Sequence, residues 1–220
     1  MWKYNSKVIM STEKEREEKI YSTEVIDFIK TSNDFCKLME NSFSMKRSGL
    51  LKELQLFLPL LYHRAMKLPV VESILEDGNE KFVTEEQYNA LKSGLVLKFG
   101  YLDDYPEVID QGELYDVPVT CSLSEDLADI YQELKDFLSL FQIGTNEMMN
   151  DAIWETCMNF NNYWGQKLLN GLRVIHKVLN TEEPVNDEEV LPDTSGEDGQ
   201  RDTSSWFVTK RQDDMREGDL

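Results

Sequence analysis

The stretch that decides the fold covers residues 122–179 and reads SLSEDLADIYQELKDFLSLFQIGTNEMMNDAIWETCMNFNNYWGQKLLNGLRVIHKVL. It opens with Ser122 and, three residues later, Glu125, which is the pattern of a helix-capping box. Apolar residues then recur at helical spacing, pause at a short connection over 142–146 that contains Gly144, and resume beyond it. We therefore predict a helical hairpin around which the rest of the chain is organised.

Each predicted helix of the hairpin carries one apolar stripe for burial. The stripe of the first helix consists of Leu127, Ile130, Tyr131, Leu134, Phe137, Leu138 and Phe141. The stripe of the second consists of Met149, Ile153, Cys157, Phe160, Trp164, Leu168, Leu172, Ile175 and Val178. A helix over 147–179 would be ~50 Å long. Gly165 and Gly171 weaken it by ~1 kcal/mol each unless packing requires a small residue, so we expect a bend or a close helix contact near Trp164 and Gly165.

Three further helices precede the hairpin. The first starts near Ser22 or Thr23, and the second covers about 45–67, with Pro59 producing a kink or dividing it in two. The third opens on a capping box of Thr84 and Gln87. Residues 101–121 lack a helical period and are predicted to form a long surface loop. Its carboxylates do not follow the spacing of a calcium-binding loop; they are Asp103, Asp104, Glu107, Asp110, Glu113 and Asp116.

These elements predict an all-α fold, a bundle of five or six helices with a long C-terminal helical hairpin and a disordered acidic tail. We expect a polar N-terminal extension over 1–21, in which Met10 is an alternative start to Met1, and a single helical domain over 22–180. The tail over 181–220 holds 13 acidic and four basic residues, a net charge of −9 that leaves −10 for the rest. Its short apolar island contains Trp206 and Phe207, which we predict as candidate partner-binding residues.

The composition limits the kinds of partner that the protein can bind and indicates its cellular location. With 23 basic and 42 acidic residues, the chain carries a net charge of −19, which disfavours binding to nucleic acid or to anionic membranes. A basic or amphipathic protein partner is compatible with that charge. Three scattered cysteines provide neither a disulfide framework nor a zinc site. The sequence also lacks a signal-peptide pattern and a membrane span, so we predict a cytoplasmic protein.

Several short motifs resemble those of a bacterial family known only as domain of unknown function 5063. They are LADIYQ at 127–132 with LKDF at 134–137, NDAIWE at 150–155, and YWGQKL at 163–168. LPLLY at 58–62 and FVT at 82–84 fit less specifically. The resemblance covers about 24–179 and implies an all-α cytoplasmic domain. It implies no activity, cofactor or catalytic residue.

The acidic residues of the hairpin provide one hypothesis of catalysis. Counted outward from Gly144, acidic residues of the two helices lie opposite each other, in an arrangement similar to that of all-α nucleoside-triphosphate pyrophosphohydrolases. The alternative function is therefore a Mg²⁺- or Mn²⁺-dependent phosphohydrolase that uses Asp129, Glu133, Asp136, Asp151 and Glu155. Only one Glu-x-x-Asp pair, Glu133 and Asp136, matches the paired motif of those enzymes.

Helical phase argues against that site. Asp129 and Asp136 lie about 140° or more from the centre of their apolar stripe, and Asp151 and Glu155 lie nearly opposite theirs. We therefore expect these carboxylates to point to solvent, and a metal site only if the acidic loop or a second subunit covers the outer face of the hairpin. The aromatic residues Trp154, Tyr163 and Trp164 are expected in the core.

The sequence leans against an enzyme. It contains no nucleophile elbow and no glycine-rich phosphate loop, and neither His63 nor His176 has a local acidic partner. We predict a soluble protein-interaction domain that needs no cofactor. A further alternative is an acidic inhibitor or immunity-type protein that neutralises a basic toxin.

Overall fold

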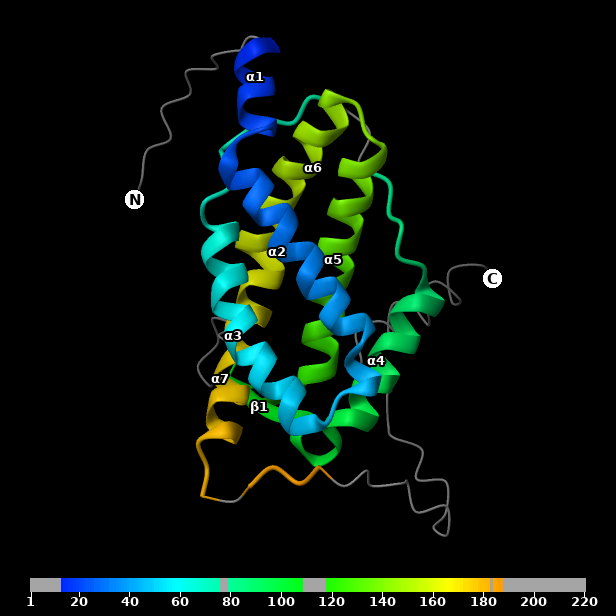
Figure 1. Ribbon diagram of the computed structural model, residues 1–220, viewed down its shortest axis with the longest axis vertical. Coiled ribbons are helices and arrows are strands. Elements are labelled where there is room, and N and C mark those ends of the chain that lie inside the picture. Colours follow the sequence, from blue (N-terminus) through cyan, green and yellow to red (C-terminus); the bar gives the residue numbers. More distant parts are fainter. Residues whose placement is uncertain (1–12, 76–78, 109–117, 183, 188–220) are drawn as a thin grey trace, which may run out of the picture. The chain divides into compact units, whose positions relative to one another are not determined.

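A computed structural model describes residues 13–75, 79–108, 118–182 and 184–187. The fold is all-α, as predicted (Figure 1). Its α-helices are α1 (Glu13–Ile20), α2 (Thr23–Glu40), α3 (Arg47–Ala65), α4 (Glu85–Phe99), α5 (Leu123–Ile143), α6 (Asn146–Asn159) and α7 (Gly165–Leu179). Short 3₁₀ turns, η1 (Ser42–Ser44) and η2 (Gly100–Leu102), and two strands, β1 (Asp104–Val108) and β2 (Pro118–Ser122), connect them.

The predicted hairpin forms the centre of this arrangement. Helix α5 packs against α2, α4, α6 and α7, while α3 packs against α2 and α7. Leu127, Ile130 and Leu134 of the predicted α5 stripe are fully buried. On the other arm Ile153, Trp164 and Leu168 are equally buried. The two stripes therefore face a common core, to which α2 and α3 add Phe28, Phe35, Leu54 and Leu58.

The second arm of the hairpin is one helix with a change of hydrogen-bond register in its middle. Helix α6 continues into a π-helical turn, η3 (Phe160–Trp164), and then into α7. This turn lies where the sequence predicted an irregularity, beside Trp164 and Gly165. Counting α6 to α7 as one rod, the described residues form six helical segments, which is within the predicted number.

The helix ends follow the capping signals. Ser22 accepts a hydrogen bond from the N–H of Val25, and Thr84 with Gln87 forms a complete capping box. Ser122 accepts from the N–H of Glu125 at the start of α5. Helix α3 runs through Pro59 as a single element, so the predicted division into two helices is wrong.

Two predicted irregular segments contain regular structure. Residues 13–20, assigned to a polar extension, form α1, whose last residue Ile20 is buried in the core. Within 101–121, predicted to be a loop, β1 and β2 pair antiparallel with Asp104 opposite Ser122. Asp103 is buried and accepts hydrogen bonds from the N–H and hydroxyl of Ser124, thereby holding the start of α5. Asp110, Glu113 and Asp116 lie outside the described residues.

Within the described ranges, no helix is both long and apolar enough to cross a membrane. Most of the predicted acidic tail lies outside these ranges, and only residues 181, 182 and 184–187 of it are described.

Candidate functional site

The predicted site carboxylates are covered by protein rather than exposed. Asp129, Asp136 and Asp151 are 7%, 3% and 3% exposed, and Glu133 and Glu155 are partly buried. The prediction that this face points to solvent is therefore wrong. The described residues between α3 and α4, 66–75 and 79–84, which we call the connecting segment, lie over the outer face of the hairpin (Figure 1). The helical phase of the apolar residues correctly located the face of the hairpin that is buried in the core. It could not show that the opposite, acidic face is also covered.

Asp151 fastens the first half of the connecting segment. Its carboxylate accepts hydrogen bonds from the N–H of Ile74 at 2.9 Å, from the N–H of Leu75 at 2.7 Å and from the hydroxyl of Ser73 at 3.1 Å. Next to it, the side-chain amide of Asn150 donates to the carbonyl of Glu72 at 2.7 Å. Buried carboxylates require such donors, so Asp151 is occupied as a backbone anchor.

One of the predicted carboxylates pairs with Lys81 in the second half of the segment, and two others act on it electrostatically. The Lys81 ammonium lies 3.0 Å from Oε1 of Glu155. Burial lowers the pKa of Lys81, but Glu155, Glu133 and Asp136 together raise it above its ordinary value. Asp136 also accepts hydrogen bonds from the N–H groups of Phe82 and Val83 at 2.7 and 2.9 Å. The metal-site hypothesis used these carboxylates as ligands of a divalent cation. In the structure the ammonium of Lys81 balances part of their negative charge instead.

A second lysine binds Asp129 and its neighbour Asp126. Nζ of Lys167 lies 2.8 Å from Oδ2 of Asp129 and 3.1 Å from Oδ1 of Asp126. The hydroxyl of Tyr88 donates to Asp129 at 2.7 Å, and that of Tyr105 donates to Asp126. We call this set the Lys167 cluster; sequence reasoning missed Lys167, Tyr88 and Tyr105 in it. The one available signal was the position of Lys167 within the motif YWGQKL at 163–168.

The electrostatics of the Lys167 cluster keep its lysine charged and its two tyrosines neutral near pH 7. Burial lowers the pKa of Lys167, but the carboxylates of Asp129 and Asp126 outweigh it and raise the pKa well above its ordinary value. Burial, together with the adjacent carboxylates, raises the pKa of Tyr88 and of Tyr105. A lysine that stays charged and tyrosines that stay neutral are poor nucleophiles and poor bases near pH 7. The cluster is suited to fixing α4, α5, β1 and α7 to one another.

The cysteines offer no activated nucleophile. Burial raises the pKa of Cys36 to about 12, and that of Cys157 to about 11. Burial and a hydrogen bond to Glu107 raise the pKa of Cys121 to about 11. Thiols with raised pKa values remain protonated and unreactive. In the part of the chain that the structure describes, no group of three or more His, Cys, Asp and Glu side chains is placed to hold a metal ion.

The predicted aromatic residues divide between core and surface. Trp164 is fully buried as expected, but Trp154 and Tyr163 are exposed, so the prediction that they belong to the core is wrong. The ring of Tyr163 lies 5.2 Å from the ammonium of Lys167. Trp206 and Phe207, the candidate partner-binding residues, lie outside the described ranges.

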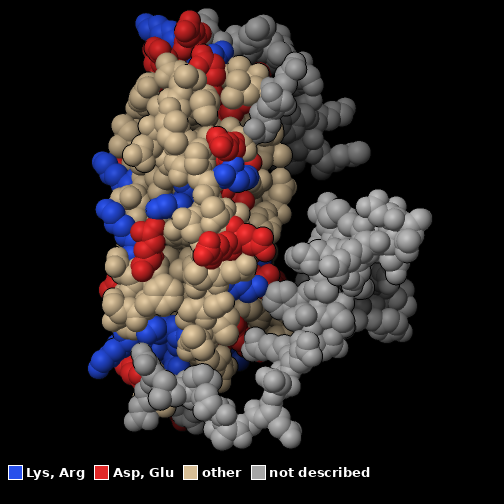
Figure 2. All heavy atoms as spheres, turned by 90° about the vertical axis from the view of Figure 1, so that its right-hand side faces the viewer, with Lys and Arg blue, Asp and Glu red and all other residues tan. Residues whose placement is uncertain are grey.

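On the face drawn in Figure 2, acidic and basic side chains are interspersed among other residues. Among the described residues visible on that face, the acidic side chains do not form one continuous field. The molecule is accordingly an all-α domain whose candidate catalytic carboxylates accept hydrogen bonds from backbone N–H groups and hydroxyls, pair with lysines or, for Glu133, accept from the side-chain amide of Asn159 at 2.7 Å.

The comparisons with known proteins place this domain in a family. The chain belongs to the family described as Domain of unknown function (DUF5063), whose model matches residues 19–181. A similar solved structure is that of protein BF1032 from Bacteroides fragilis, at 38% sequence identity and a TM-score of 0.66. The similarity covers 76% of this chain and 98% of that one. No curated protein matches significantly.

Proposed function

We propose that this protein is a cytoplasmic, non-catalytic interaction domain that binds an amphipathic protein partner through the exposed side of α3. This α3 outer face consists of the exposed residues Leu56, Pro59, Leu60 and His63. The observation that carries the proposal is that Leu56 and Leu60 are 70% and 42% exposed while the opposite side of the same helix is fully buried.

Helix α3 carries apolar residues on its solvent side as well as on the side that packs in the core. Leu54, Leu58 and Leu61 face the core, as one stripe of an amphipathic helix does. Leu56 and Leu60 extend the apolar surface around the helix to the solvent side. The two leucines are spaced four residues apart, and His63 follows three residues after Leu60 on the same side of the helix. This i, i+4, i+7 spacing is the one by which one helix binds another helix or a groove.

The charges beside these leucines favour one kind of partner. Lys52 and Lys67 flank the α3 outer face at its two ends, with Glu53 beside Lys52. A partner helix with an apolar stripe and acidic flanking residues complements that pattern. The sequence predicts a basic or an amphipathic partner; the partner proposed here is amphipathic, and its charge is opposite to that of the basic alternative.

A pair of matched variants tests the proposal. Leu56→Asp with Leu60→Asp should abolish partner recovery after cross-linking in native cells, because two aspartates remove the apolar surface and repel acidic flanking residues. Leu97→Asp, at a site that is 65% exposed on α4, should leave recovery unchanged. Both variants should remain folded, with a loss of about 0.5 kcal/mol for each aspartate placed in a helix, which thermal unfolding checks. Equal recovery with both variants would contradict the proposal.

The second candidate is the Mg²⁺- or Mn²⁺-dependent phosphohydrolase that uses Asp129, Glu133, Asp136, Asp151 and Glu155. One observation favours it: Oδ2 of Asp136 is buried and accepts no hydrogen bond among the described residues. Trp206 and Phe207 remain a candidate second contact for the partner in the first proposal. An acidic inhibitor of the immunity type would require a basic partner and an acidic binding surface.

A further inference from the structure

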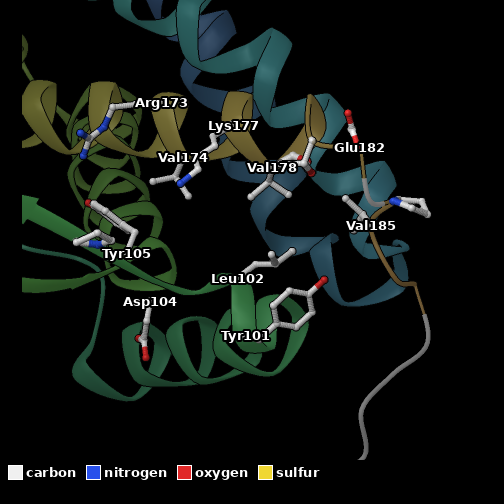
Figure 3. Close-up of a pocket in the computed structure, with 13 residues that line it drawn as sticks. Tyr101, Leu102, Asp104, Tyr105, Arg173, Val174, Lys177, Val178, Glu182 and Val185 are labelled. Carbon is white, nitrogen blue, oxygen red and sulfur yellow. The ribbon is translucent and has the colours of Figure 1, made fainter.

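A cavity of about 590 Å³ opens beside the C-terminal half of α7 (Figure 3). Val174 and Val178 of α7 line one side, Leu102 of η2 lines another, and Val185 closes a third. Tyr101 and Tyr105 add aromatic surface. The volume lies in the usual range of small-molecule sites, about 300–1,000 Å³.

The wall that carries Val185 is held in place by the start of α3. Lys46, which precedes α3, makes no capping hydrogen bond with its side chain. Asp187 caps the helix instead, accepting from the N–H of Ser48 at 2.8 Å and from its hydroxyl at 2.7 Å. Arg47 donates to the carbonyl of Asn186 at 2.6 Å. These bonds make the cavity a feature of the fold.

Two cationic side chains are among those that line the cavity. Arg173 and Lys177 lie one helical turn apart on α7, and within the described ranges neither forms an ion pair with a carboxylate. Lys167, two turns earlier, is bound by two aspartates. Asp104 and Glu182 also line the cavity, but Figure 3 shows their carboxylates directed away from the apolar side chains.

We propose that this cavity binds a small amphipathic organic anion. Its acidic group pairs with Arg173 and Lys177, and its apolar body packs on Leu102, Val174 and Val178. An inorganic anion would leave the apolar walls unused, and an uncharged ligand would leave both cations without a partner. This site is separate from the α3 outer face, and its occupancy does not depend on the proposed partner.

Calorimetric titration of the full chain with decanoate tests the site. We expect one decanoate to bind per chain, and decyltrimethylammonium, which has the same apolar tail and the opposite charge, not to bind. Arg173→Gln with Lys177→Gln should weaken decanoate binding about tenfold or more, because both charge-assisted contacts are removed. Lys52→Gln with Lys67→Gln is the matched control and should change the Kd by less than about twofold.

A further control separates the cavity from other apolar surface. Leu56→Asp with Leu60→Asp should leave decanoate binding unchanged, because those side chains lie on the α3 outer face. The proposal is overturned if no saturable binding occurs below about 1 mM, if the cationic amphiphile binds equally well, or if removing Arg173 and Lys177 has no effect.

Discussion

At the scale of single residues, Gly165 shows why a glycine stands in the middle of a helix. Its N–H donates to the carbonyl oxygen of Phe160, which is the hydrogen bond of a π turn. A Cβ at this position would lie 2.4 Å from that same oxygen and 3.1 Å from two ring atoms of Phe160. The carbonyl oxygen of Phe160 belongs to the backbone and cannot move aside as the end of a flexible side chain can. The π turn therefore requires glycine at position 165.

Gly165→Ala should therefore lower the free energy of unfolding by about 2 kcal/mol, the usual cost of overpacking. Urea denaturation measures the change. Gly49→Ala in α3 is the control, because no atom within 4 Å opposes its new Cβ, and it should raise stability by about 0.5–1 kcal/mol. A Gly165→Ala protein as stable as the natural one would mean that the π turn can revert to an ordinary α-helix.

The sequence identified Gly165 because a glycine inside a helix is costly unless packing needs it. It did not identify the π turn, since a one-residue change of hydrogen-bond register leaves the apolar spacing nearly intact. It also could not pair Asp187 with Ser48, which lies 139 positions away. Local caps such as Thr84 with Gln87 were predictable because both partners lie within one helical turn.

At the scale of elements, the helices were predictable and the connections between them were not. Helical period and capping residues placed α2 to α5 because both signals are local. Strands β1 and β2 were missed because a strand is defined by its partner, and Tyr105 meets Cys121 only through pairing across intervening residues. The connecting segment was missed for a similar reason: its anchors, Asp136 and Asp151, belong to other helices.

Asp151→Ala tests the role of the connecting segment. Removing the carboxylate leaves the N–H groups of Ile74 and Leu75 without their hydrogen-bond acceptor. The free energy of unfolding should therefore fall by about 3 kcal/mol. Asp34→Ala, at an exposed position of α2, should change it by less than about 0.5 kcal/mol.

The same variant separates the anchoring role of Asp151 from a metal-binding role. We expect millimolar Mn²⁺ to leave the thermal unfolding of the natural protein unchanged. Stabilisation by Mn²⁺ that disappears in both Asp151→Ala and Glu133→Ala would instead support the phosphohydrolase.

At the scale of the whole molecule, the net charge was predictable but its location was not. Five aspartates are buried within the described residues, namely Asp103, Asp126, Asp129, Asp136 and Asp151. They neutralise lysines or bind backbone N–H groups and hydroxyls, so these five negative charges hold elements of the fold together. The net charge of −19 taken alone predicts an acidic surface. It does not show which charged side chains are buried.

These buried carboxylates should give the protein an unusual dependence of stability on pH. Burial raises the pKa of Asp126 to about 6 from an ordinary value of 3.8, despite the opposing effects of Tyr105 and Lys167. The folded state therefore holds this proton more tightly than the unfolded chain, and the free energy of unfolding rises as the pH falls toward 4. Burial also raises the pKa values of Glu133 and Asp136, which adds to the same trend.

Urea denaturation at pH 7 and pH 5 tests this dependence. For Asp126 alone, the gain in stability on going to pH 5 should be about 1 kcal/mol. Asp126→Asn should lose that part of the gain, because an amide does not titrate, while Asp34→Asn should keep all of it. If Asp126→Asn shows the same gain as the natural protein, Asp126 is ionised at both pH values in the folded state. Its charge would then be fully compensated by Lys167 and Tyr105, in spite of its burial.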